Sequence, residues 1–136
     1  MNETSTETLS VVVEREIPYP PEKIWRALTQ PHLIEEWLMK NDFKPVVGHS
    51  FNLRADWGVV DCQVLAVEPN KTLSYTWAAF GLESVVSWTL TPTTTGTDLR
   101  VEQSGFRPDQ PQVYQGAKGG WQQFFSALEQ VLARID

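Results

Sequence analysis

The sequence predicts an α+β fold, in which a curved antiparallel sheet of about seven strands wraps around one long C-terminal helix. Two observations carry this prediction. Between residues 43 and 105 the chain alternates apolar and polar residues and is divided by short turn sequences, which is typical of consecutive antiparallel strands. From Asp109 to Asp136 the apolar residues instead recur with a helical period, and no other stretch provides a helix long enough to cover the sheet.

The first strand is predicted from Leu9 to Ile17, because apolar residues there alternate with polar ones. By this alternation Leu9 and Arg15 both face inward. Arg15 has two interpretations: a strand-end residue paired with a carboxylate, or a positive charge at the mouth of a pocket. Residues 1–8, which are polar and acidic, are predicted to form a flexible tail.

Two short helices are predicted next, and both must pack on the rest of the chain because they are too short to be stable alone. Pro20 and Pro21 suit a first helical turn, and a second helix is predicted from Pro31 to about Leu38 with Thr29 as its cap. The sheet then continues through strands predicted near 43–47, 49–55, 58–68, 71–79, 83–92 and 97–105. Their apolar residues share one face, so we expect that face to be covered and the other to be solvated.

The last helix is predicted to pack on the sheet through one apolar stripe. Asp109 is its predicted cap, with Gln112 three residues later. Gly116, Gly119 and Gly120 interrupt the pattern, and each interior glycine costs about 1 kcal/mol relative to Ala. They indicate either a break near residue 118 or one helix with room beside its N-terminal half. The stripe comprises Trp121, Phe124, Phe125, Leu128, Val131 and Leu132.

Composition narrows the classes of function. The 136 residues are predicted to hold one domain, residues 9–136, and the net charge of −6 with scattered basic residues argues against nucleic acid or an anionic membrane as partner. No apolar run is long enough to span a bilayer, and the N-terminus lacks the apolar core of a secretion signal, so a cytoplasmic location is expected. The single cysteine, Cys62, excludes an intramolecular disulfide.

Several motifs between residues 9 and 134 are shared with a known family. They include Ala27-Leu28-Thr29-Gln30-Pro31, Glu36-Trp37-Leu38, Trp88-Thr89-Leu90-Thr91-Pro92 and Gly119-Gly120-Trp121. On these the chain resembles the START-like helix-grip (SRPBCC) superfamily, and within it the small bacterial single-domain proteins of the family named for the activator of the heat-shock chaperone ATPase. The resemblance implies a helix-grip fold, a cavity for apolar or aromatic molecules and a connection with the stress response. Chaperone-activating members carry a further N-terminal domain that this sequence lacks, so chaperone activation is not expected.

The sequence offers little for metal or covalent chemistry. His32 and His49 lack the spacing of a metal site, and neither is placed to activate Cys62, which is predicted to be a buried strand residue. We therefore expect no metal, no cofactor and no catalytic residue. An enzyme on this scaffold, such as a cyclase, hydratase or hydrolase, remains an alternative if Arg15, Asp61 or Glu83 points inward.

The aromatic residues are the strongest candidates for a functional site. A curved sheet gripped by a single helix leaves a gap, and large rings either close that gap or line it. We expect stacking and apolar burial to bind a small hydrophobic or aromatic molecule, with Tyr75 and Gln103 orienting it. A homodimer is compatible with the sequence, and a chaperone-type interaction module is the third hypothesis. The predicted ligand-binding residues are Trp37, Trp57, Tyr75, Trp77, Trp88, Gln103, Trp121, Phe124 and Phe125.

Overall fold

The structure, a computed structural model, describes residues 8–135 and confirms the predicted α+β class. The tail predicted at residues 1–8 falls almost wholly outside this range. The strands of the described chain are β1 (Leu9–Ile17), β2 (Lys40–Asn41), β3 (Ser50–Ala55), β4 (Gly58–Glu68), β5 (Thr72–Ala79), β6 (Leu82–Pro92) and β7 (Thr97–Phe106). The helices are α1 (Pro21–Thr29), α2 (Pro31–Trp37) and α3 (Pro111–Arg134).

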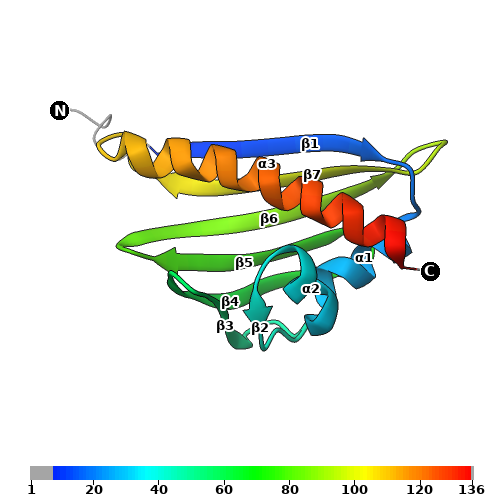
Figure 1. The fold of residues 1–136 in the computed structure, drawn as a ribbon, viewed down its shortest axis with the longest axis horizontal. Coiled ribbons are helices and arrows are strands. Elements are labelled where there is room, and N and C mark those ends of the chain that lie inside the picture. The colour runs from blue at the N-terminus through cyan, green and yellow to red at the C-terminus, as the bar shows by residue number, and fades with distance from the viewer. Residues whose placement is uncertain (1–7, 136) are drawn as a thin grey trace.

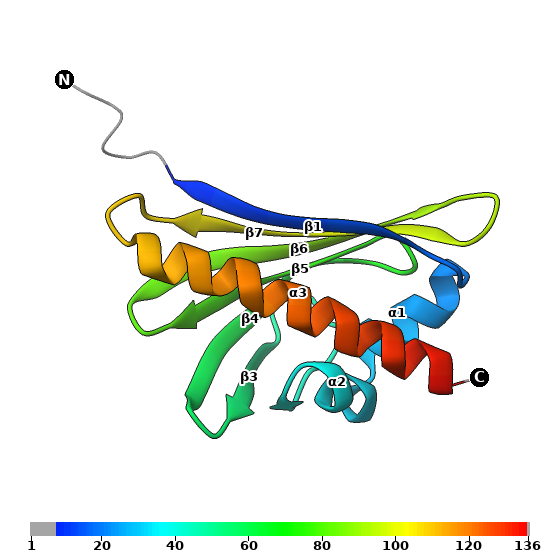
Figure 2. The same ribbon diagram turned by 45° about the horizontal axis from the view of Figure 1, so that its top comes forward.

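The strands form one antiparallel sheet in the order β1-β7-β6-β5-β4-β3-β2. From β2 to β7 the strands follow chain order, as short turns require, and only β1 reaches across to pair with the last strand. The helix α3 runs along one face of the sheet, while α1 and α2 lie beside its C-terminal half (Figure 1). Figure 2 shows β3 and β4 turning toward the side on which α3 lies. The sheet therefore packs along α3, and the C-terminal half of α3 also lies beside α1 and α2.

Most of the core lies between the sheet and α3. The apolar stripe of α3 is buried at Trp121, Phe125, Leu128, Val131 and Leu132, while Phe124 is only partly buried. Along the strands, buried residues of the inner face alternate with more accessible residues of the outer face. This is clearest in β7, whose burial alternates from Thr97 to Gln103. The period-2 pattern of the sequence thus corresponds to the two faces of the real sheet.

Several local predictions were wrong. Residues 43–47 form no strand, since Val46 and Val47 are exposed and the edge of β3 away from β4 pairs with the two-residue β2 instead. Leu9 is 38% exposed, because a register shift between Leu9 and Ser10 breaks the alternation at the start of β1.

The two predicted side-chain caps are also absent. Gln30 and Gln110 stand at the N-cap positions of α2 and α3, neither helix has a capping side-chain hydrogen bond, and each begins with proline. Proline presets the helical φ and needs no partner for an N–H, so it supplies the start instead. The Thr29 hydroxyl donates backward to the Trp25 carbonyl at 2.7 Å, and Asp109 accepts two bonds from Arg107.

Candidate functional site

An apolar pocket of about 160 Å³ lies between the N-terminal half of α3 and the inner face of the sheet. The sheet provides aromatic and aliphatic walls, and α3 provides a wall that is partly bare of side chains. The exposed Trp57 and Val113 belong to the lining, so the pocket reaches the surface beside them. Its lining consists of Met39, Trp57, Trp77, Leu82, Gln103, Phe106, Val113, Gly116, Ala117, Gly120, Trp121 and Phe124.

Glycines create much of the space beside α3. Residues 111–134 form one uninterrupted helix, so Gly116, Gly119 and Gly120 do not mark a break. A Cβ built on any of the three would meet nothing within 4 Å. Gly116 and Gly120 line this pocket, whereas Gly119 lies toward β1 in a separate groove. Of the two alternatives left open by the sequence, the structure has the single helix with room beside its N-terminal half.

The predicted aromatic set divides into two groups. Trp57, Trp77, Trp121, Phe124 and the amide of Gln103 line the pocket. The other four predicted residues are buried behind it and fill the core: Trp37, Tyr75, Trp88 and Phe125.

The two groups are in direct contact through Trp121. The Trp121 ring packs edge-on against Trp88 at 5.7 Å, and Trp77 and Phe124 pack on Trp121 at 5.7 and 5.5 Å. Trp88 in turn meets Trp37 at 5.6 Å. A single aromatic cluster therefore begins in the closed core and ends as the wall of the pocket.

Hydrogen bonds hold the polar groups of this cluster in place. The indole N–H of Trp121 donates to Oε1 of Gln103 at 2.7 Å, and Nε2 of Gln103 donates to the Ser84 hydroxyl at 2.9 Å. Ser84 in turn donates to the carbonyl of Trp77 at 2.8 Å. This chain of bonds links α3 to β7, β6 and β5, so it fixes the pocket wall as a unit.

Tyr75 occupies a separate buried position. Its hydroxyl accepts a hydrogen bond from the Trp88 indole at 3.1 Å, and burial raises the Tyr75 pKa well above its usual value. Tyr75 does not line the pocket, so an orienting role for it toward a guest there has no geometric support.

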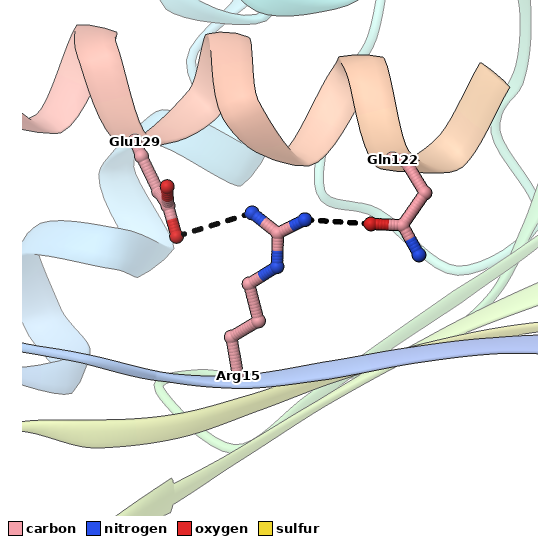
Figure 3. Close-up of polar contacts among 3 residues, drawn as sticks. All are labelled: Arg15, Gln122 and Glu129. Atoms are coloured by element: carbon pink, nitrogen blue, oxygen red, sulfur yellow. Dashed lines mark hydrogen bonds and ion pairs between the residues drawn. The ribbon is translucent and has the colours of Figure 1, made fainter. Parts of the chain in front are cut away.

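Arg15 bridges β1 and α3 away from the pocket (Figure 3). Its guanidinium donates to Gln122 at 2.6 Å, lies 3.5 Å from a Glu129 carboxylate oxygen, and sits 5.2 Å from the centre of the Phe125 ring. The first interpretation of Arg15, pairing with a carboxylate, matches this geometry. Arg15 therefore fastens the helix to the edge strand.

Among residues 8–135, no acidic or basic side chain lines the pocket. Asp61 is exposed and accepts a hydrogen bond from Asn52, and Glu83 is exposed beside the outer face. Cys62 is buried, and burial together with the nearby Asp61 raises the pKa of its thiol to about 12. Within residues 8–135 no group of three or more His, Cys, Asp or Glu side chains could hold a metal.

An exposed aromatic pair stands at the rim. Trp57 follows β3 and is 53% exposed, and Phe80 follows β5 and is 77% exposed, with ring centres 5.6 Å apart. Phe80 has φ of +53°, a left-handed conformation that is uncommon for a bulky residue. Gly58 makes this approach feasible, because a Cβ there would lie 3.2 Å from the Phe80 ring.

Other depressions are larger but lack such walls. One beside β1 and one across β5 to β7 measure about 470 and 520 Å³, and both are lined by short, polar or solvated side chains. Among the described helices, none combines the length and apolar character needed to cross a membrane. The pocket beside α3 is thus the best-formed candidate for an apolar guest.

The chain matches a protein-family model and is similar to several solved structures. The family model for "Activator of Hsp90 ATPase homolog 1-like protein" matches residues 18–133. Protein MLL2253 from Mesorhizobium loti is similar over 94% of this chain and 99% of its own, with 71% identity and a TM-score of 0.91. Protein BH1534 from Bacillus halodurans is 27% identical over 91% and 96% of the two chains, with a TM-score of 0.82.

A third solved structure is DynU16, described as a putative protein in the dynemicin biosynthetic locus. It is 29% identical, with a TM-score of 0.82, and the match covers 92% of this chain but 47% of DynU16. No curated protein matches the chain significantly.

Proposed function

The chain belongs to the family of activator of Hsp90 ATPase homolog 1-like proteins, and on that premise we propose that it binds a small hydrophobic or aromatic molecule in the pocket beside α3. The family has a ligand-binding fold. The observation that carries the proposal is the set of aromatic side chains, from β5 and from α3 itself, that surround a stretch of α3 where glycine leaves the surface bare. Trp77, Trp121 and Phe124 supply flat apolar surface, and Gly116 and Gly120 supply room.

The volume limits the size of the guest. An apolar cavity of about 150 Å³ in another protein accommodates benzene, so about 160 Å³ suits one aromatic ring with a small substituent. A larger molecule would extend past Trp57 and Val113 into solvent. Burying such a ring is favourable at about 25 cal/mol for each Å² of apolar surface removed from water.

Binding is better supported than catalysis. General acid–base chemistry requires a titratable group at the reacting atoms, and none of the described residues that line the pocket carries one. The setting of DynU16 in a biosynthetic locus agrees with a small-molecule ligand for this fold. A chaperone-type interaction would instead use an exposed apolar surface, because the pocket of about 160 Å³ is too small to receive more than one side chain of a protein segment.

A thermal-shift screen with single-ring aromatic compounds tests the proposal. A guest that binds only the folded state raises stability by about 2.7 kcal/mol at one hundred times its Kd. Gly120→Leu fills the pocket and should abolish the shift, while Gly119→Leu, on the same helix but outside the pocket, should keep it. An absence of any shift in the wild type, or an equal response of the two variants, would contradict the proposal.

A further inference from the structure

The side chains that line the pocket indicate the charge and the hydrogen-bonding groups of its ligand. In the part of the chain that the structure describes, no Lys, Arg, His, Asp or Glu lines it. A charged guest would lose its hydration without meeting an opposite charge, which is strongly unfavourable in apolar surroundings. The guest of this pocket is therefore expected to be neutral.

Gln103 is already committed to the protein. An indole nitrogen can only donate, so the bond from Trp121 identifies the amide oxygen of Gln103 and orients the whole amide. Its nitrogen then donates to Ser84. With the residue only 2% exposed, Gln103 serves mainly to hold the pocket wall.

Trp77 retains an unused donor. It lies on the inner face of β5, two residues after Tyr75, and its ring packs on Trp121. Within residues 8–135 its indole N–H makes no hydrogen bond. It is not sealed inside the protein either, because no enclosed side-chain nitrogen or oxygen in this part of the chain lacks a partner. The Trp77 side chain lines the pocket and carries this unused donor.

We propose that the pocket selects a neutral single-ring molecule bearing a hydrogen-bond acceptor, such as a carbonyl oxygen, which accepts from the indole N–H of Trp77. Trp57, whose indole also has no hydrogen-bond partner in the described chain, offers a second donor at the rim for an acceptor farther from the ring. The inference rests on the proposed function and specifies the class of ligand for the same pocket.

Three compounds of nearly equal size and shape separate the contributions of apolar burial, hydrogen bonding and charge to binding. Isopropylbenzene is apolar, acetophenone carries one carbonyl acceptor, and benzoate carries a negative charge. Their Kd values are measured by titration calorimetry for the wild type, for Trp77→Phe and for Trp37→Phe. Trp37 is the matched control, because its indole donates to the Ala27 carbonyl and lies outside the pocket.

The diagnostic quantity is the ratio of the Kd values for acetophenone and isopropylbenzene, which cancels any general effect of the smaller ring. Trp77→Phe should raise this ratio roughly fivefold, the value of one ordinary hydrogen bond, and Trp37→Phe should leave it unchanged. Benzoate should bind the wild type at least about tenfold more weakly than acetophenone.

Each contrary result has a distinct meaning. The proposed ligand class is wrong if the ratio is unchanged in Trp77→Phe, or if benzoate binds as tightly as acetophenone. In either case the proposed function still stands as long as isopropylbenzene binds. If neither isopropylbenzene nor acetophenone binds the folded wild type, the proposed function fails, and the ligand class fails with it.

Discussion

Replacing the glycines of α3 by alanine should stabilise the protein. Gly116, Gly119 and Gly120 lie inside a helix, where glycine costs about 1 kcal/mol relative to alanine. None of them has a positive φ, and a new Cβ would meet nothing within 4 Å, so no steric term opposes the gain. Each substitution should therefore raise the free energy of unfolding by about 1 kcal/mol, and Gly116→Ala with Gly120→Ala by about 2 kcal/mol.

Urea unfolding followed by circular dichroism measures this gain, and the melting temperature should rise by about 3–5 °C for each substitution in a chain of this length. Gly120→Leu extends the test. If the pocket is hollow, the larger side chain is accommodated, whereas a filled site would be overpacked at a cost of about 1–3 kcal/mol. The reasoning is refuted if Gly116→Ala or Gly120→Ala destabilises the protein while Gly119→Ala does not, because the space beside α3 would then be occupied.

Three further predictions concern the groups around the pocket. Trp121→Phe removes the donor to the buried Oε1 of Gln103 and should lower the free energy of unfolding by about 1–3 kcal/mol, as judged by urea unfolding; a loss within error would mean that the bond contributes nothing. Arg15→Met keeps the aliphatic stem over Phe125 but loses the charge, so it should cost less than about 1 kcal/mol, and a larger loss in a thermal melt would show a stronger role for the Glu129 pair. Burial raises the pKa of the Cys62 thiol from 9.0 to about 12, so the thiol ionises at lower pH in the unfolded state than in the folded state. The free energy of unfolding should therefore fall as pH rises through that window. Native Cys62 should also resist thiol reagents at pH 8, and fast labelling would contradict its burial.

The fold was predictable because its signals are local. Alternation along β4 to β7 and short turns between them dictate an antiparallel meander, and the apolar stripe of α3 identifies the one helix that can cover it. The strand predicted at 43–47 failed for a physical reason. Val46 and Val47 have strand propensity, but they lie in a loop where no neighbouring strand pairs with them, so propensity without a partner misled the prediction.

The site was only partly predictable. Periodicity identifies the face on which a side chain lies, but not how far along that face the helix covers it. Tyr75 and Trp77 share the inner face of β5, yet Tyr75 is buried in the core and Trp77 lines the pocket. The nature of α3 was undecided for a similar reason. The intrinsic cost of Gly116 and Gly120 favours a break, and packing of the same helix at Trp121, Phe125 and beyond outweighs it.

The position of the empty space on α3 also bears on how this scaffold can diversify. Because this pocket exists where glycines of α3 have no side chain, and not because of the path of a loop, its size can be changed one residue at a time. Alanine, serine or valine at 116 or 120 would shrink or reshape it without moving a strand, since no neighbouring atom stands in the way. Relatives that keep the same backbone can therefore differ in the guests they accept through two helical positions, and those positions are where divergence in specificity should first be sought.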